Sequence, residues 1–169
     1  MSASPERALR RALEAAGLNA WGVVSGESWD ACVAPAFRLD ALGPDARVAT
    51  TPRATVGVVV GAGGRSLFEA FRAAPEARLA EANGLDDYTV RVVEEAAATV
   101  LGQGFAALCV FAHRPRAGVF ADFVALGRAA GLGWPSRLRL LLHPDFGPWM
   151  SLRAAILTDA PLALSASLT

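Results

Sequence analysis

The segment HPDFGPWMSLRAAIL, residues 143–157, is the most informative stretch of this sequence. Its two prolines restrict the backbone of a turn, Gly147 permits close approach of another backbone, and Phe146 and Trp149 offer flat aromatic faces. The apolar residues that follow predict a strand. Two interpretations of the turn stay open: a loop that holds a large planar ligand, or a proline-rich hairpin with Trp149 packed on the core and His143 hydrogen-bonded to the backbone.

Around this segment, capping signals and hydrophobic periodicity predict a mixture of helices and strands. Ser4-Pro5-Glu6 is a typical helix start, and Gly17 is a typical stop. We expect helices at residues 5–16, 67–73, 86–101 and 120–130, and strands at residues 20–25, 55–60, 105–112, 138–142 and 150–157. Residues 27–53, which contain three prolines, are predicted to be irregular. Because strands and helices alternate at unequal spacing, the sequence predicts one α+β domain over residues 1–169.

The composition narrows the class of protein. The chain has 169 residues, 53% hydrophobic and 19% charged, so a compact globular domain is expected. Its 16 basic and 16 acidic side chains cancel, so no net field attracts nucleic acid or an anionic membrane. The charged amino-terminal residues differ from a signal peptide, and a cytoplasmic protein is expected. Cys32 and Cys109 are too few for an iron–sulfur cluster, and no metal ligands are predicted from the histidine spacing.

Further motifs carry a resemblance to known families. Together with AHRPR at residues 112–116 and APAFRL at residues 34–39, the segment 143–157 resembles the cobalamin-processing proteins of the CblC type. AGLGW at residues 130–134 and ILTD at residues 156–159 resemble the related epoxyqueuosine reductases and reductive dehalogenases. The resemblance implies a nitroreductase-like α+β fold with a central, mainly antiparallel sheet flanked by helices. It also implies binding and handling of cobalamin in its base-off form, with reductive or thiol-dependent removal of the upper ligand as a further step.

The resemblance also assigns residues. Arg153 is the candidate catalytic residue, because the corresponding arginine faces the carboxylate of a thiol co-substrate. Strand alternation predicts that Ser151, Arg153 and Ala155 share one face. The alternative is an Arg153 that pairs with Asp145 or Asp159 at a strand edge. The residues expected to bind the cofactor are His113, Arg116, Gly131, Gly133, Trp134, His143, Phe146, Gly147 and Trp149.

Two departures from these families limit the expectations. First, the chain has two cysteines and is expected to hold no iron–sulfur cluster of its own. Second, the acidic residue that donates a proton in epoxyqueuosine reductases corresponds to a position near Ala117, so this proton donor is expected to be missing. The expected partners are cobalamin and either a thiol or an external reductase, and a homodimer stays open. One alternative is an FMN-dependent reductase of nitroreductase-like fold, although only Arg114 and Arg116 are placed to bind the FMN phosphate. Another is a non-catalytic partner subunit of an iron–sulfur protein.

Overall fold

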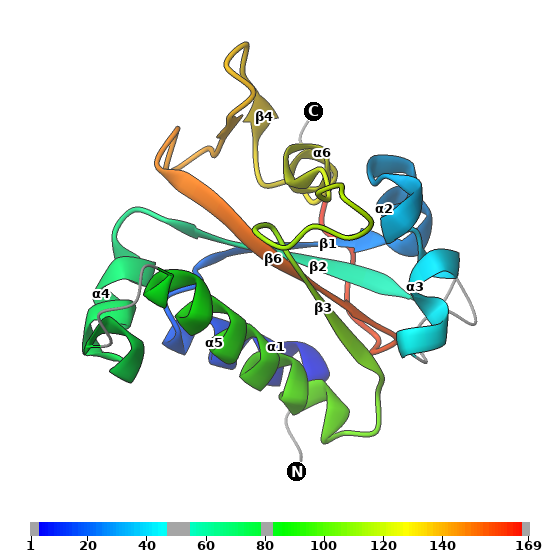
Figure 1. Cartoon of the computed structure of the whole chain (residues 1–169), viewed down its shortest axis with the longest axis horizontal. Coiled ribbons are helices and arrows are strands. Elements are labelled where there is room, and N and C mark those ends of the chain that lie inside the picture. Colours follow the sequence, from blue (N-terminus) through cyan, green and yellow to red (C-terminus); the bar gives the residue numbers. More distant parts are fainter. Residues whose placement is uncertain (1–3, 47–54, 79–82, 167–169) are drawn as a thin grey trace.

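A four-stranded antiparallel sheet forms the centre of the protein in the computed structural model, which describes residues 4–46, 55–78 and 83–166 (Figure 1). Strand β6 lies between β2 and β3 although it is the last strand in the sequence. The strands, in their order across the sheet, are β1 (Ala20–Ser25), β2 (Val56–Gly63), β6 (Met150–Thr158) and β3 (Ala107–Phe111).

Helices cover both faces of the sheet, because the central strands are apolar on both sides. In β2, Val58 and Val60 belong to one buried cluster, whereas Val59 belongs to a second cluster on the other face. The first cluster is covered by α1 (Pro5–Ala15), α4 (Ser66–Ala73) and α5 (Gly84–Leu101). The second is covered by α2 (Gly26–Cys32), η1 (Pro35–Phe37), α3 (Leu39–Ala46) and α6 (Phe123–Ala129).

Two short strands, β4 (Trp134–Pro135) and β5 (Leu141–Leu142), pair with each other outside the central sheet. They form an arm, residues 134–142, that extends away from the body of the molecule (Figure 1). A short 3-10 helix, η3 (Pro75–Arg78), precedes α5. None of the described helices combines the length and the apolar composition that a bilayer crossing requires.

The α+β class with an antiparallel central sheet is confirmed, and β1 has the predicted bounds. The irregular segment predicted at 27–53 is wrong where it is described, since α2, η1 and α3 form there. Pro35 occupies the first turn of η1, where a proline costs no backbone hydrogen bond. Trp29 is fully buried, and its Nε1 donates to the Phe37 carbonyl at 2.8 Å, which ties this segment to the core. Residues 47–53 of the predicted segment lie outside the described residues.

Smaller corrections concern element ends. The helix predicted at 120–130 begins at Phe123, because the Asp122 carboxylate caps it by accepting from the Ala125 amide at 2.9 Å. Of the strand predicted at 138–142 only β5 forms. A turn replaces the rest, with the Ser136 amide donating to the Leu140 carbonyl at 2.8 Å.

Candidate functional site

The turn at residues 143–149 and the loop at residues 113–116 lie at the same end of the sheet. In an antiparallel sheet the ends of β2 and β3 meet the beginning of β6, and Gly63 pairs with Met150 there. The Ala112 amide donates to the Arg153 carbonyl at 2.9 Å, which joins the loop to β6. We call this region the sheet-end site.

Three of the predicted residues build the turn itself. His143 Nδ1 accepts from the Asp145 amide at 3.1 Å and from the Phe146 amide at 3.4 Å. His143 and Gly147 exchange backbone hydrogen bonds of 3.0 and 2.8 Å, and the rings of His143 and Phe146 lie 4.7 Å apart. The Phe146 ring also occupies the space over Gly63 that a Cβ atom would fill. The interpretation in which His143 bonds to the backbone is therefore confirmed.

Trp149, in contrast, is not part of the core. Its side chain is 78% exposed, so the alternative that packed Trp149 on the core is wrong. The Gly64 amide donates to the Trp149 carbonyl at 2.9 Å and holds the Trp149 backbone against the end of β2. The aromatic ring that packs on the end of β2 is that of Phe146, which lies over Gly63. Beside Trp149 lies an open hollow of about 270 Å³, lined also by Phe68, Leu85 and Arg153. The sheet-end site thus presents an exposed indole above a small hollow.

Arg153 faces this hollow because β6 carries a β-bulge. Val60 pairs with Ala154 but Gly61 pairs with Leu152, so Arg153 is an extra residue between them. Ser151 and Arg153 line the same hollow, as expected. Ala155 does not join them, since it packs in the cluster on the opposite face of the sheet. The prediction of one shared face is wrong for Ala155, because the bulge reverses the alternation of side chains at this point.

The Arg153 guanidinium has an acidic neighbour that was not among the expected ones. Its Nη1 lies 3.9 Å from Asp86 Oδ1, in the first turn of α5, and His113 Nδ1 lies 3.8 Å from the same oxygen. The predicted pairing with Asp145 or Asp159 is wrong. Asp145 lies 4.0 Å from the His143 ring and is largely exposed, and Asp159 accepts from the Ala106 amide at 2.8 Å.

Sequence reasoning missed Asp86 as a site residue. Asp86 was visible only as an acidic residue at a helix start, where a carboxylate is favoured with or without a function. Arg153 Nε is buried, and no hydrogen-bond partner for it exists within the described part of the chain. The guanidinium therefore interacts with Asp86 through charge, and its Nε–H is a buried donor without a partner among the described residues.

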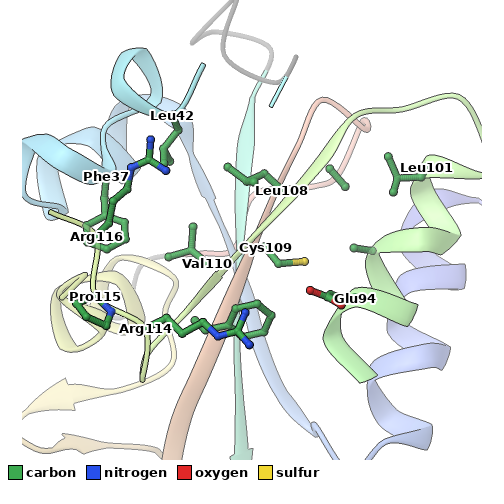
Figure 2. A pocket seen from close by; sticks show the side chains of 13 residues that line it. Phe37, Leu42, Glu94, Leu101, Leu108, Cys109, Val110, Arg114, Pro115 and Arg116 are labelled. Carbon is green, nitrogen blue, oxygen red and sulfur yellow. The ribbon is translucent and has the colours of Figure 1, made fainter. Parts of the chain in front are cut away.

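Arg116 lines a different cavity, a groove of about 470 Å³ along the outer edge of β3 (Figure 2). One wall comes from α5, with Glu94 and Leu101, and the other from η1 and α3. Arg116 Nη2 donates to the Ala41 carbonyl at 3.2 Å, and the Arg114 guanidinium lies 5.1 Å from the centre of the Phe111 ring. The two arginines that an FMN phosphate would need therefore already have contacts with the protein.

Cys109 also lines this groove (Figure 2). Burial, followed by the nearby charge of Glu94, raises the pKa of its thiol to about 12. Since the thiolate is the reactive form, Cys109 is inert at neutral pH.

Gly131, Gly133 and Trp134 lie on the arm side of α6. A Cβ atom on Gly131 would collide with the Ala166 carbonyl, and one on Gly133 would collide with the backbone of Leu142. Both glycines thus give room to the backbone of this chain. Trp134 is 45% exposed on β4, opposite Leu142 of β5. The arm connects Trp134 to the turn that begins at His143.

The cavity with the largest volume described here contains none of the predicted residues. It measures about 890 Å³ and lies between α6 and the arm, where Phe120, Asp122, Arg128 and Arg139 contribute to its lining. Sequence reasoning missed it because its residues come from separate segments that share no motif.

Comparisons with known proteins show a solved structure of similar fold. No protein-family model and no curated protein sequence matches the chain. Among solved structures, it is similar to the crystal structure of a C. elegans B12-trafficking protein CblC, a human MMACHC homologue, with a TM-score of 0.60 and 13% sequence identity. The match covers 95% of this chain and 70% of that chain. At this identity the likeness shows the fold, and it confirms the expected nitroreductase-like class.

Proposed function

We propose that this protein binds and handles cobalamin. The observation that carries the proposal is the similarity of fold, over 95% of the chain, to a protein described as B12-trafficking. The residues that carry the sequence resemblance are independent support, since the turn at 143–149 and the loop at 113–116 meet at one end of the sheet.

The exposed apolar surface of the sheet-end site fits a corrin ring. A corrin is broad and apolar on its faces and carries amides around its rim, so it favours flat apolar side chains next to free backbone and polar groups. Trp149, at the end of the turn, is 78% exposed, and Trp134, at the start of the arm that leads into the turn, is 45% exposed. The hollow of about 270 Å³ is smaller than most small-molecule pockets. In this proposal the ring therefore lies across the surface and covers the hollow.

The nine predicted residues then divide by role. Trp134 and Trp149 contact the faces of the ring. His113 supplies a polar group to its amide rim, whereas Arg116, which lines the groove along β3, has no contact with the ring in this proposal. The remaining residues set the shape of the surface and are positioning residues: Gly131, Gly133, His143, Phe146 and Gly147.

A titration tests the binding proposal. Added protein is expected to shift the absorption spectrum of hydroxocobalamin toward the base-off form. Trp149→Ala is expected to weaken binding by about tenfold, because exposed tryptophans at the centre of a contact surface carry much of its affinity. The matched control is Leu164→Ala, which removes another exposed apolar side chain, 57% accessible, that lines neither the hollow nor the cavity between α6 and the arm.

Two outcomes would contradict the proposal. If micromolar protein leaves the hydroxocobalamin spectrum unchanged and the purified protein is yellow with FMN, the flavin alternative replaces it. If Phe120→Ala weakens cobalamin binding and Trp149→Ala does not, the ligand lies in the cavity between α6 and the arm.

Removal of the upper ligand is the finer part of the proposal. A thiolate sulfur attacks the methyl group on cobalt, the S–C bond forms as the Co–C bond breaks, and the electron pair of that bond stays on cobalt. The thiol proton goes to solvent. Arg153, which lines the hollow beside Trp149, anchors the carboxylate of the thiol through its guanidinium group.

A further inference from the structure

The cavity between α6 and the arm has the size and the charge distribution of a ligand site. Its volume of about 890 Å³ lies in the range of about 300–1,000 Å³ that small-molecule pockets occupy. Arg128, in the last turn of α6, and Arg139, near the tip of the arm, both line it. Within the described ranges of the chain, neither guanidinium has a carboxylate partner. The lining of the cavity therefore includes two guanidinium groups without an ion-pair partner among the described residues.

Near the start of α6 the lining of the cavity is acidic and aromatic. Asp122 caps α6 and keeps oxygen lone pairs beyond the one that accepts from the Ala125 amide. Phe120 is 57% exposed and lines the same end. Arg128 lies six positions after Asp122, which places the two residues about 9 Å apart along the helix axis. A ligand in this cavity thus meets an aromatic ring and an acceptor toward the start of α6 and the Arg128 guanidinium toward its end, with Arg139 also in the lining.

Arg139 lines the cavity from a tight turn of the arm. Arg139 has φ 59°, in the left-handed region that residues other than glycine rarely adopt. The turn imposes this conformation, with the Arg139 amide donating to the Ser136 carbonyl at 3.0 Å. Ser136 and Arg139 line the cavity, whereas Arg137 and Leu138 do not. Strained residues of this kind cluster at binding sites, where the surrounding structure maintains them.

We propose that this cavity binds an aromatic ring linked through a polar spacer to a phosphate, which is the chemistry of a nucleotide. The ring stacks on Phe120 and packs against Pro135, and its amino group or the ribose hydroxyls donate to Asp122. Arg128 and Arg139 bind the phosphate, which their planar guanidinium groups match with paired hydrogen bonds. The ligand is either a free nucleotide or the nucleotide portion of a larger molecule such as cobalamin.

The first test measures adenosine monophosphate binding to the full chain by calorimetry at low ionic strength. We expect Arg128→Gln and Arg139→Gln each to weaken binding by about tenfold, because each removes charge-assisted hydrogen bonds. Adenosine, which lacks the phosphate, should bind more weakly than the monophosphate and be insensitive to both changes. Arg137→Gln is the matched control, since it removes an exposed arginine of the same arm that does not line the cavity. An equal loss in Arg137→Gln would overturn the proposal.

The second test separates the two sources of the nucleotide. It compares cobalamin with cobinamide, a corrinoid without the nucleotide. If the site takes the nucleotide of the corrinoid, Arg139→Gln weakens cobalamin binding and leaves cobinamide binding unchanged. If Arg139→Gln affects neither adenosine monophosphate nor cobalamin, the inference is overturned while the proposed function stands. If no corrinoid binds at all, the proposed function fails and the adenosine monophosphate result alone decides this inference.

Discussion

At the scale of single residues, the chemistry of the sheet-end site depends on the electrostatic interaction between the Asp86 carboxylate and the Arg153 guanidinium. Asp86 Oδ1 lies 3.9 Å from the guanidinium and 3.8 Å from His113 Nδ1, so one carboxylate faces two nitrogen-bearing side chains. Neither distance is that of a hydrogen bond. The pair is partly exposed, which limits its contribution to stability. A carboxylate ligand could therefore compete with Asp86 for Arg153 without first breaking a hydrogen bond.

Arg153→Ala and Asp86→Asn are predicted to change the thiol-dependent reaction in opposite directions. Arg153→Ala should raise the KM for a carboxylate-bearing thiol about tenfold or more, since it removes charge-assisted hydrogen bonds, and leave cobalamin binding nearly unchanged. Asp86→Asn should lower that KM, because it removes the competing carboxylate. The measurement is demethylation of bound methylcobalamin followed by absorption at varied thiol concentration. Tight cobalamin binding without turnover by any thiol or reduced flavin would leave a carrier and refute the enzymatic step.

At the scale of elements, the sequence predicted those whose signals are local. The limits of β1 follow from a short run without charged residues after the helix stop at Gly17, and the cap of α1 follows from Ser4 and Pro5. The bulge at Arg153 could not be predicted, because it depends on the register between β6 and β2, which the sequence of β6 by itself does not contain. The helices within residues 26–46 were missed for a related reason. Prolines favour helix starts as well as loops, and the burial of Trp29 depends on tertiary packing.

Gly63→Ala is predicted to destabilise the turn at residues 143–149. Gly63 lies in a strand, so its backbone tolerates alanine, but the new Cβ would collide with the Phe146 ring. Overpacking of this kind costs about 1–3 kcal/mol, measurable by urea unfolding. In a Phe146→Ala background the same change should cost less, because the ring is gone. Additive effects in this double-mutant cycle would show that Gly63 and Phe146 do not constrain each other.

At the scale of the whole molecule, long-range strand pairing brings the site together. β6 pairs with β2 and β3, so residues near 63, 113 and 149 meet although about 85 positions separate the first from the last. The sequence resemblance indicated the turn and the loop as one site, and the fold supports that grouping. The cavity between α6 and the arm was not predicted, because its lining depends on where the arm lies relative to α6, and no local pattern encodes that position.

Ligand binding is predicted to raise the thermal stability of the whole domain. A ligand that binds only the folded state, at one hundred times its Kd, stabilises it by about 2.7 kcal/mol. For a chain of 169 residues this corresponds to a rise in Tm of about 5–10 °C. We therefore expect hydroxocobalamin to produce such a shift in thermal unfolding followed by circular dichroism. Trp149→Ala, with tenfold weaker binding, should show about half of the stabilisation at the same ligand concentration. A shift with FMN and none with hydroxocobalamin would assign the fold to flavin chemistry instead, since mass action stabilises only the protein that binds the added ligand.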